Sequence, residues 1–222
     1  MTGRMPVLVV EDHQLLAQTL ELALRMKGVA AQWVGGVGPS EVLSTAAALQ
    51  PELVLLDLDL GGAASGLDLI EPLRAGGAAV LMLTGVTDRV RLAECIEAGA
   101  IGIVPKDLPL DQVVEAITET VNERPPLTRC ARDELLAELR RHREEERRRL
   151  APFERLSATE RAVLRALVDG HAAEAIAADR YVSIATVRSQ IRGILRQLGV
   201  NSQLEAVAAA RRAGWPPRAR TR

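Results

Sequence analysis

Aromatic residues and cysteines are scarce in this chain of 222 residues, which has one Phe, one Tyr, two Trp and two Cys. A hydrophobic core must therefore be built mainly from Ala, Leu, Val and Ile, and the hydrophobic content of 48% is enough for a sizeable one. Cys95 and Cys130 form no Cys-x-x-Cys motif, which argues against a zinc site of that type and against a disulfide framework. We therefore expect a protein of a reducing compartment.

Long apolar stretches are also missing. No run of the sequence approaches the roughly 18 apolar residues that a membrane helix needs, and no charged start followed by an apolar stretch marks a signal peptide. These absences predict a soluble, cytoplasmic protein with no membrane partner.

The formal net charge of −1 hides an uneven distribution along the chain. Residues 1–120 contain 7 basic residues (Lys and Arg) and 16 acidic ones (Asp and Glu), a net charge of −9. Residues 121–150 contain 9 basic and 7 acidic residues, a net charge of +2, and residues 151–222 contain 12 and 6, a net charge of +6. An acidic front and a basic rear indicate two domains with different partners, a cation for the first and a polyanion for the second.

Short apolar runs recur in the first half, and each ends in reactive polar residues. Val7–Val10 precedes Glu11 and Asp12, Leu53–Leu56 precedes Asp57, Val80–Leu83 precedes Thr84, and Ile103–Val104 with Pro105 precedes Lys106. Runs of this kind, separated by amphipathic stretches of helical length, are typical of parallel strands that are buried on both faces. With a further strand near residues 30–34, they predict an α/β fold with a five-stranded, doubly wound parallel sheet.

The polar groups at the strand ends are expected to converge, because ligands of open α/β sheets bind beyond the carboxyl ends of the strands. Taken singly, each is an ordinary strand-end or loop residue, but five at four strand ends indicate a site. Clustered carboxylates repel one another unless a cation intervenes, and their oxygen atoms suit Mg²⁺. With a Lys106 ammonium and a Thr84 hydroxyl nearby, Asp57 is a candidate nucleophile that forms an acyl phosphate.

The middle of the chain is expected to be a charged linker. Arg124-Pro125-Pro126 ends the last helix of the front domain, and a helix without Gly or Pro follows over residues 133–150. Its pattern predicts an exposed spacer held by ion pairs one turn apart, in which Leu135 and Leu139 are available to contact a second copy of the chain.

The rear of the chain is predicted to be a small all-α helix-turn-helix domain. Ser157 and Glu160 form a capping-box pattern at a helix start, and Tyr181-Val182-Ser183 is expected to be the turn before a helix over residues 184–198. Three arginines recur on one face of that helix at intervals of four, namely Arg188, Arg192 and Arg196. A basic second helix of this motif is the element that enters the major groove of double-stranded DNA.

The motifs VLVVEDH, LVLLDLDL, VLMLTG and GAIGIVPKD together resemble those of the receiver domain of bacterial two-component response regulators. The resemblance implies a flavodoxin-like fold in which Asp57 accepts a phosphoryl group from a sensor histidine kinase. It further implies that Thr84 and Lys106 contact the phosphoryl group, and that Mg²⁺ is held by the side chains of Glu11, Asp12 and Asp57 with the main chain of Asp59.

The stretches LSATERAVLRAL and EAIAADRYVSIATVRSQIRGILRQLGVNSQLEAVAAA resemble the LuxR-type helix-turn-helix of regulators of the NarL/FixJ class. The resemblance places Ser183 and Thr186 near DNA phosphates and implies that Arg188 and Gln190 reach bases. With the basic face, the expected DNA-binding set is Ser183, Thr186, Arg188, Gln190, Arg192 and Arg196. The expected domains are a receiver over residues 1–122, a charged helical linker over 123–152, and a DNA-binding domain with a basic tail over 153–222.

Departures from the family pattern limit what the resemblance implies. Ile103 occupies the switch position where the receiver family usually has Tyr or Phe, Gly61 stands in a glycine-rich loop where Pro is usual, and Asp59 adds a further carboxylate near the phosphate. In the helix-turn-helix, Glu174 replaces a usual lysine and Arg180 a usual leucine. Without the aromatic switch, a regulator that works independently of phosphorylation, with an atypical receiver, stays an alternative.

An enzyme is the alternative of another class. Asp57-Leu-Asp59 matches the two acids of phosphatases of the haloacid dehalogenase type, although their motif follows the first core strand and here it follows the third. The favoured interpretation is a DNA-binding transcriptional response regulator. In it, phosphorylation of Asp57 biases homodimer formation and promoter binding, and the chain turns over no separate substrate.

Overall fold

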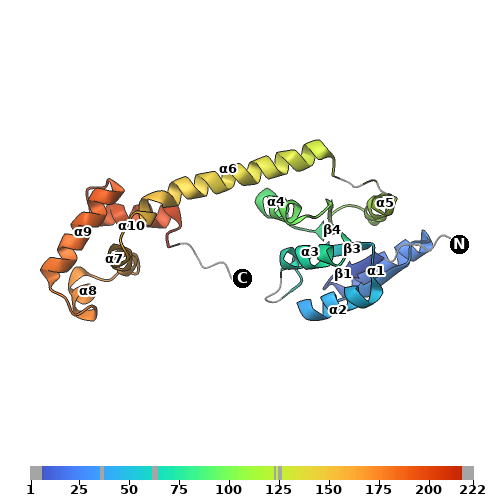
Figure 1. Cartoon of the computed structure of the whole chain (residues 1–222), viewed down its shortest axis with the longest axis horizontal. Coiled ribbons are helices and arrows are strands. Elements are labelled where there is room, and N and C mark those ends of the chain that lie inside the picture. Colours follow the sequence, from blue (N-terminus) through green and yellow to red (C-terminus); the bar gives the residue numbers. More distant parts are fainter. Residues whose placement is uncertain (1–6, 36–37, 62–64, 123, 125–126, 217–222) are drawn as a thin grey trace. The chain divides into compact units, whose positions relative to one another are not determined.

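The computed structural model describes residues 7–35, 38–61, 65–122, 124 and 127–216. The chain divides into two compact units, residues 1–141 and 142–222 (Figure 1). Among the described residues, no helix combines the length and the apolar character required to cross a membrane.

The first unit is built on a parallel sheet with the strand order β2-β1-β3-β4-β5. The strands are β1 (Val7–Val10), β2 (Ala31–Val34), β3 (Leu53–Asp57), β4 (Ala79–Thr84) and β5 (Gly102–Pro105). The helices between and after them are α1 (Gln14–Met26), α2 (Pro39–Leu49), α3 (Gly66–Ala75), α4 (Arg89–Ala98) and α5 (Leu110–Val121). The predicted doubly wound fold is therefore confirmed.

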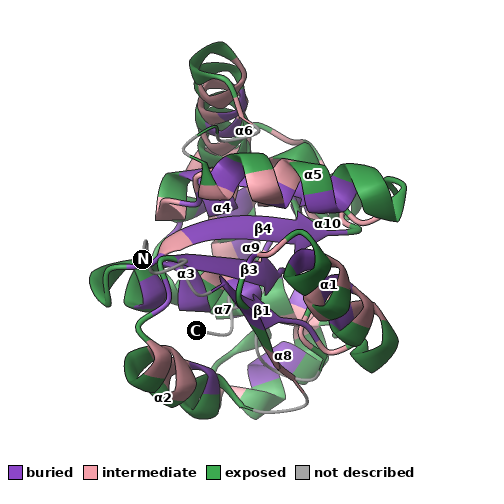
Figure 2. Cartoon of the chain, turned by 90° about the vertical axis from the view of Figure 1, so that its right-hand side faces the viewer, coloured by how far each residue is buried: buried purple, intermediate pink, exposed green. Residues whose placement is uncertain are grey.

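Helices cover both faces of this sheet, which explains why its central strands are almost entirely apolar. Side chains of α1 and α5 pack on one face against Val7, Val9 and Leu55, while those of α2, α3 and α4 pack on the other against Leu8 and Leu56. Figure 2 shows β1, β3 and β4 buried between helices whose outer sides are exposed. The strand order reverses between β1 and β3, so their carboxyl ends open onto the crevice where ligands of such sheets bind.

Helix α6 (Arg129–Glu154) is longer than predicted, and its first part is not an exposed spacer. The side chains of Leu135 and Leu139 are only 7% and 1% exposed and belong to the same hydrophobic cluster as Ile96 of α4. The prediction that these two leucines contact a second copy of the chain was therefore wrong. A stripe of leucines on a helix shows that the helix has a packing partner, and here the partner is the first unit itself.

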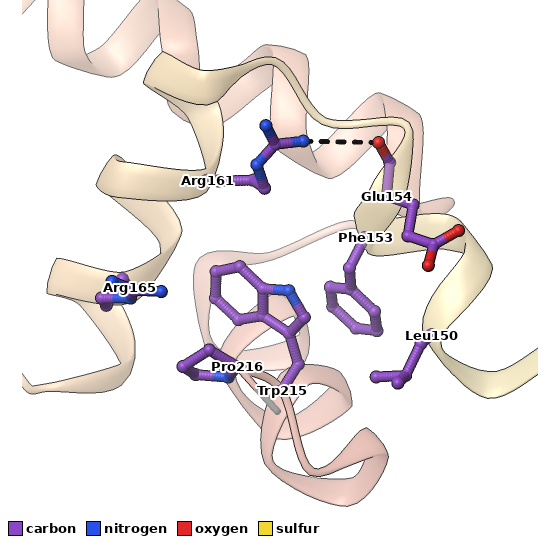
Figure 3. A pocket seen from close by; sticks show the side chains of 7 residues that line it. All are labelled: Leu150, Phe153, Glu154, Arg161, Arg165, Trp215 and Pro216. Carbon is purple, nitrogen blue, oxygen red and sulfur yellow. Dashed lines mark hydrogen bonds between the residues drawn. The ribbon is translucent and has the colours of Figure 1, made fainter. Parts of the chain in front are cut away.

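The second unit is helical, with α7 (Ala158–Val168), α8 (Ala173–Asp179), α9 (Ile184–Leu198) and α10 (Gln203–Ala213). Its core includes two of the few aromatic residues, since the rings of Phe153 and Trp215 stack with their centres 5.6 Å apart. Figure 3 shows this pair beside a pocket into which Arg165 also points, while the Arg161 guanidinium donates a hydrogen bond to the main-chain oxygen of Glu154. The basic tail, residues 217–222, lies outside the described residues.

Side-chain caps fix where the helices of the second unit begin. Ser157 Oγ accepts a hydrogen bond from the backbone N–H of Glu160 at 3.2 Å, and the Glu160 carboxylate accepts one from the backbone N–H of Ser157 at 2.9 Å. Ser183 Oγ caps α9 in the same way by accepting from the backbone N–H of Thr186. The predicted capping box at Ser157 is confirmed, and the Ser183 cap holds the turn before the basic helix in place.

Substituting Ser157→Ala should lower the free energy of unfolding of the second unit by about 1 kcal/mol, because the substitution removes a helix N-cap. Urea unfolding followed by the fluorescence of Trp215 in a Trp33→Phe background measures this. Ser189→Ala, an exposed position inside α9, is the matched control and should leave the midpoint nearly unchanged. Equal midpoints for the two variants would show that the cap contributes nothing.

Candidate functional site

The strand ends bring the predicted polar groups to one edge of the sheet. Glu11 follows β1, Asp57 and Thr84 are the last residues of β3 and β4, and Lys106 follows β5. Glu11, Asp57 and Thr84 are at most 2% exposed. Because the paired parallel strands point the same way, residues far apart in the sequence meet at this edge.

The ammonium group of Lys106 lies between two buried carboxylates. Lys106 Nζ donates hydrogen bonds to Asp57 Oδ2 at 2.7 Å and to Glu11 Oε1 at 2.9 Å, and it lies 2.8 Å from Glu11 Oε2. Burial, together with the charge of Glu11, raises the pKa of Asp57 against the opposing effect of Lys106. Burial disfavours the charged ammonium, but the hydrogen bonds to Asp57 and Glu11 outweigh it and raise the pKa of Lys106.

His13 joins this cluster, although the sequence analysis gave it no role. Its backbone N–H donates to Glu11 Oε1 at 3.0 Å, and its Nδ1 lies 3.1 Å from Glu11 Oε1 and 2.7 Å from Asp12 Oδ1. The contact with Glu11 and the charge of Asp12 raise the pKa of His13. Its place directly after two acids in the VEDH motif was the only signal in the sequence.

The residues at this edge fit a hard divalent cation. Glu11, Asp12, His13 and Asp57 each offer one ligand atom, and these atoms all lie within 4.8 Å of one another. Two carboxylate oxygens, Glu11 Oε2 and Asp12 Oδ1, are buried without a hydrogen bond among the described residues, although Lys106 and His13 lie close to them as charged neighbours. Oxygen atoms with spare acceptor capacity in a carboxylate-rich pocket are the donors that Mg²⁺ prefers.

Thr84 ends the strand beside that of Asp57, and Asp59 lies two residues after Asp57. Thr84 Oγ1 accepts a hydrogen bond from the backbone N–H of Val86 at 3.1 Å, and the backbone N–H of Asp59 donates to Asp57 Oδ1 at 3.2 Å. The Asp59 side chain is 60% exposed and pairs with Arg91 on α4, with Arg91 Nη2 2.8 Å from Asp59 Oδ1. The main chain of Asp59 thus contacts the acceptor carboxylate, while its side chain contacts a helix. Part of the glycine-rich loop, residues 62–64, lies outside the described residues.

The switch position is filled by a residue of the core. Ile103 lies on β5 beside Met82 of β4 and is partly buried against the cluster that includes α4 and the leucines of α6. An aliphatic side chain packed in this way has no polar group with which to respond to a change at Asp57.

A basic surface forms on α9 in the second unit. Arg188, Arg192 and Arg196 are all exposed on this helix, as are Ser183 and Thr186 at its start. Arg188 Nη2 lies 3.3 Å from Glu174 Oε1 of α8, so the two helices of the motif are joined by an ion pair at their exposed side. The arrangement presents cations, hydroxyls and a helix N-terminus, all of which bind phosphate oxygens of nucleic acids.

Gln190 is placed differently from the arginines. It follows Val187 by three positions and precedes Ile194 by four, and both of these are buried in the core of the second unit. The side-chain oxygen of Gln190 is itself buried, without a hydrogen bond among the described residues. The structure therefore does not present Gln190 alongside Arg188, and its contact with a base stays a prediction.

Two family models match the chain in these two regions. Residues 7–118 match the response regulator receiver domain, and residues 154–210 match the bacterial regulatory proteins of the luxR family. A nitrate/nitrite response regulator protein homolog from Haemophilus influenzae is 32% identical over 212 residues, which cover 93% of this chain and 96% of that protein. A probable transcriptional regulatory protein NarL from Mycobacterium tuberculosis is 29% identical over 215 residues, which cover 93% of each chain.

Solved structures agree with this assignment at the level of the fold. A two-component response regulator RcsB in complex with DNA aligns with a TM-score of 0.50 at 19% identity, over 94% of this chain and 98% of that one. A CheY-like receiver domain protein from Methanospirillum hungatei aligns with a TM-score of 0.50 at 21% identity, over 55% of this chain and 97% of that one. The chain belongs to the response regulators, with a receiver domain followed by a LuxR-type DNA-binding domain.

Proposed function

We propose that this response regulator is phosphorylated on Asp57 by a sensor histidine kinase and that the phosphoryl group changes its dimerisation and its binding to promoter DNA. The observation that carries the proposal is the buried contact of the Lys106 ammonium with Asp57 and Glu11. A carboxylate at a strand end, beside a fixed cation and two further acids, combines a nucleophile with the charges that a phosphoryl group requires.

In the proposed transfer, an Asp57 oxygen forms a bond to phosphorus while the bond from phosphorus to the nitrogen of the kinase phosphohistidine breaks, and that nitrogen keeps the electron pair. Lys106 neutralises oxygens of the incoming group from its position at Asp57, and Thr84 contributes a hydroxyl from the end of β4. Mg²⁺ bound by Glu11, Asp12, Asp57 and the main chain of Asp59 would supply further neutralisation of charge. The chain acts on no separate substrate.

The second unit is the proposed DNA-binding part, with α9 as the helix that enters the major groove. Arg188, Arg192 and Arg196 are exposed together on it, and the acidic receiver offers no comparable basic helix among its described residues. We assign the receiver to residues 1–122, the linker to 123–152 and the DNA-binding domain with its tail to 153–222. The active form is a homodimer, and the protein acts in the cytoplasm, where its DNA is.

Incubation with acetyl phosphate and Mg²⁺ should add one phosphoryl group per chain, because Asp57 is the single proposed acceptor. Intact-mass measurement checks this, and Asp57→Asn should abolish the uptake. Asp59→Asn is the matched control, since Asp59 contributes its main chain rather than its side chain to the pocket, and it should still take up phosphoryl. Chelation of Mg²⁺ should suppress the uptake in every variant.

The two alternatives give other results in the same experiment. Repeated turnover of a small phosphate ester, lost in Asp59→Asn, would identify a phosphatase that uses both acids. Phosphoryl uptake with no change in mass by light scattering and no change in DNA affinity would instead identify a regulator that works independently of phosphorylation.

Substituting Arg188→Ala should weaken DNA binding by about 1 to 3 kcal/mol, and Glu174→Gln should strengthen it at low salt, because the carboxylate beside Arg188 repels phosphates. Fluorescence anisotropy over a salt series, with duplexes that the protein selects from a random library, measures both changes. Arg165→Ala, an exposed arginine on α7, is the control. Unchanged affinity and salt dependence in Arg188→Ala would exclude α9 as the recognition helix.

A further inference from the structure

Arg91 connects the phospho-acceptor loop to α4. Its guanidinium lies 2.8 Å from the carboxylate of Asp59, whose backbone N–H donates to Asp57 itself. The hydrogen bond to Asp59 raises the pKa of Arg91, which stays charged. The ion pair is exposed on both sides and is therefore weak, which means that a stronger anion close by can compete for the same guanidinium.

Polar contacts attach the linker helix α6 to both ends of the same helix, α4. Near the start of α4, Arg89 Nε donates to Glu138 Oε2 of α6 at 2.7 Å. At the end of α4, Arg132 of α6 donates to the main-chain oxygens of Ile96 at 3.3 Å and Ala100 at 3.4 Å. The Ile96 carbonyl lies in the last turn of α4, where the helix dipole favours a cation.

Apolar packing completes the attachment of α6 to the receiver. Leu135 and Leu139 are buried in the cluster that contains Ile96 of α4, and Ile103 of β5 packs against that cluster. The switch position, Ile103, is thus in contact with the core that α6 covers. A shift of α4 changes the surface on which these leucines rest.

We propose that Arg91 links Asp59 to α4 and that α4 transmits the state of Asp57 to the linker helix. Helix α4 is held by Asp59 at one side and by α6 at the other, through Arg89, Arg132 and Leu139. This inference rests on the proposed phosphorylation of Asp57. In this proposal, charged contacts couple Asp57 to the linker helix, a role that the aliphatic Ile103 does not fill.

The direction of the change follows from charge. Phosphorylation replaces the single negative charge of the Asp57 carboxylate with about two negative charges close to Asp59, so the Arg91 guanidinium is attracted away from its present partner and draws the first turn of α4 with it. The Ile96 carbonyl that Arg132 contacts belongs to the same short helix, and the Ile96 side chain shares the apolar cluster of Leu139. Phosphorylation therefore loosens the first part of α6 from the receiver.

Hydrogen exchange measured by mass spectrometry on the full chain tests this inference. After incubation with acetyl phosphate and Mg²⁺, amide exchange in residues 129–141 of the wild type should rise by about tenfold or more, because local opening sets the exchange rate. Arg91→Met should take up the phosphoryl group but lose this rise, and Arg91→Lys should restore part of it. Arg132→Met should exchange fast in α6 with or without phosphoryl.

Arg140→Met is the matched control, because Arg140 is an exposed arginine on the same helix, and it should respond as the wild type does. Phosphoryl uptake without a change in exchange over residues 129–141, or a wild-type response in Arg91→Met, would overturn the inference and leave the proposed function intact. A wild type that takes up no phosphoryl group would overturn both.

Discussion

The ion contact of Lys106 with Asp57 and Glu11 is the constraint on which the rest of the structure depends. Two carboxylates buried at adjacent strand ends repel each other, and the Lys106 ammonium, 2.7 Å from Asp57 and 2.9 Å from Glu11, compensates that repulsion. The parallel sheet, which is buried on both faces, brings the carboxyl ends of β1, β3, β4 and β5 to one edge and so places these groups. In the same cluster, Glu11 Oε2 and Asp12 Oδ1 have no hydrogen bond among the described residues, and carboxylate oxygens of this kind are suited to a hard metal ion.

Asp59 connects the site to α4, and α4 contacts the linker helix α6. Asp59 binds Asp57 by its main chain and Arg91 by its side chain, and α4 in turn contacts α6. The linker is thereby a part of the receiver up to about residue 141. In the DNA-binding unit, the Glu174 carboxylate lies beside Arg188 and weakens the general attraction of the basic helix for phosphates.

The features that the sequence predicted correctly are those that short-range patterns determine. Apolar runs gave the strands, the polar residues after them gave Glu11, Asp57 and Lys106, and the Ser157 cap was visible from its partner three residues later. It did not predict the partner of the leucine stripe on α6, because helical periodicity identifies a buried face but not what covers it. Arg91 was missed since its contact with Asp59 joins residues 32 positions apart, and the burial of Gln190 depends on how α9 packs.

The pKa of Asp57 tests the central claim most directly. NMR of the Asp57 carboxyl carbon through a pH titration in the absence of Mg²⁺ measures it in the wild type and in Lys106→Met. Burial and the charge of Glu11 raise this pKa, and the hydrogen bond from Lys106 lowers it, so the pKa should rise further when the ammonium is removed. An unchanged pKa in Lys106→Met would show that Lys106 does not stabilise the acceptor carboxylate and would contradict the account.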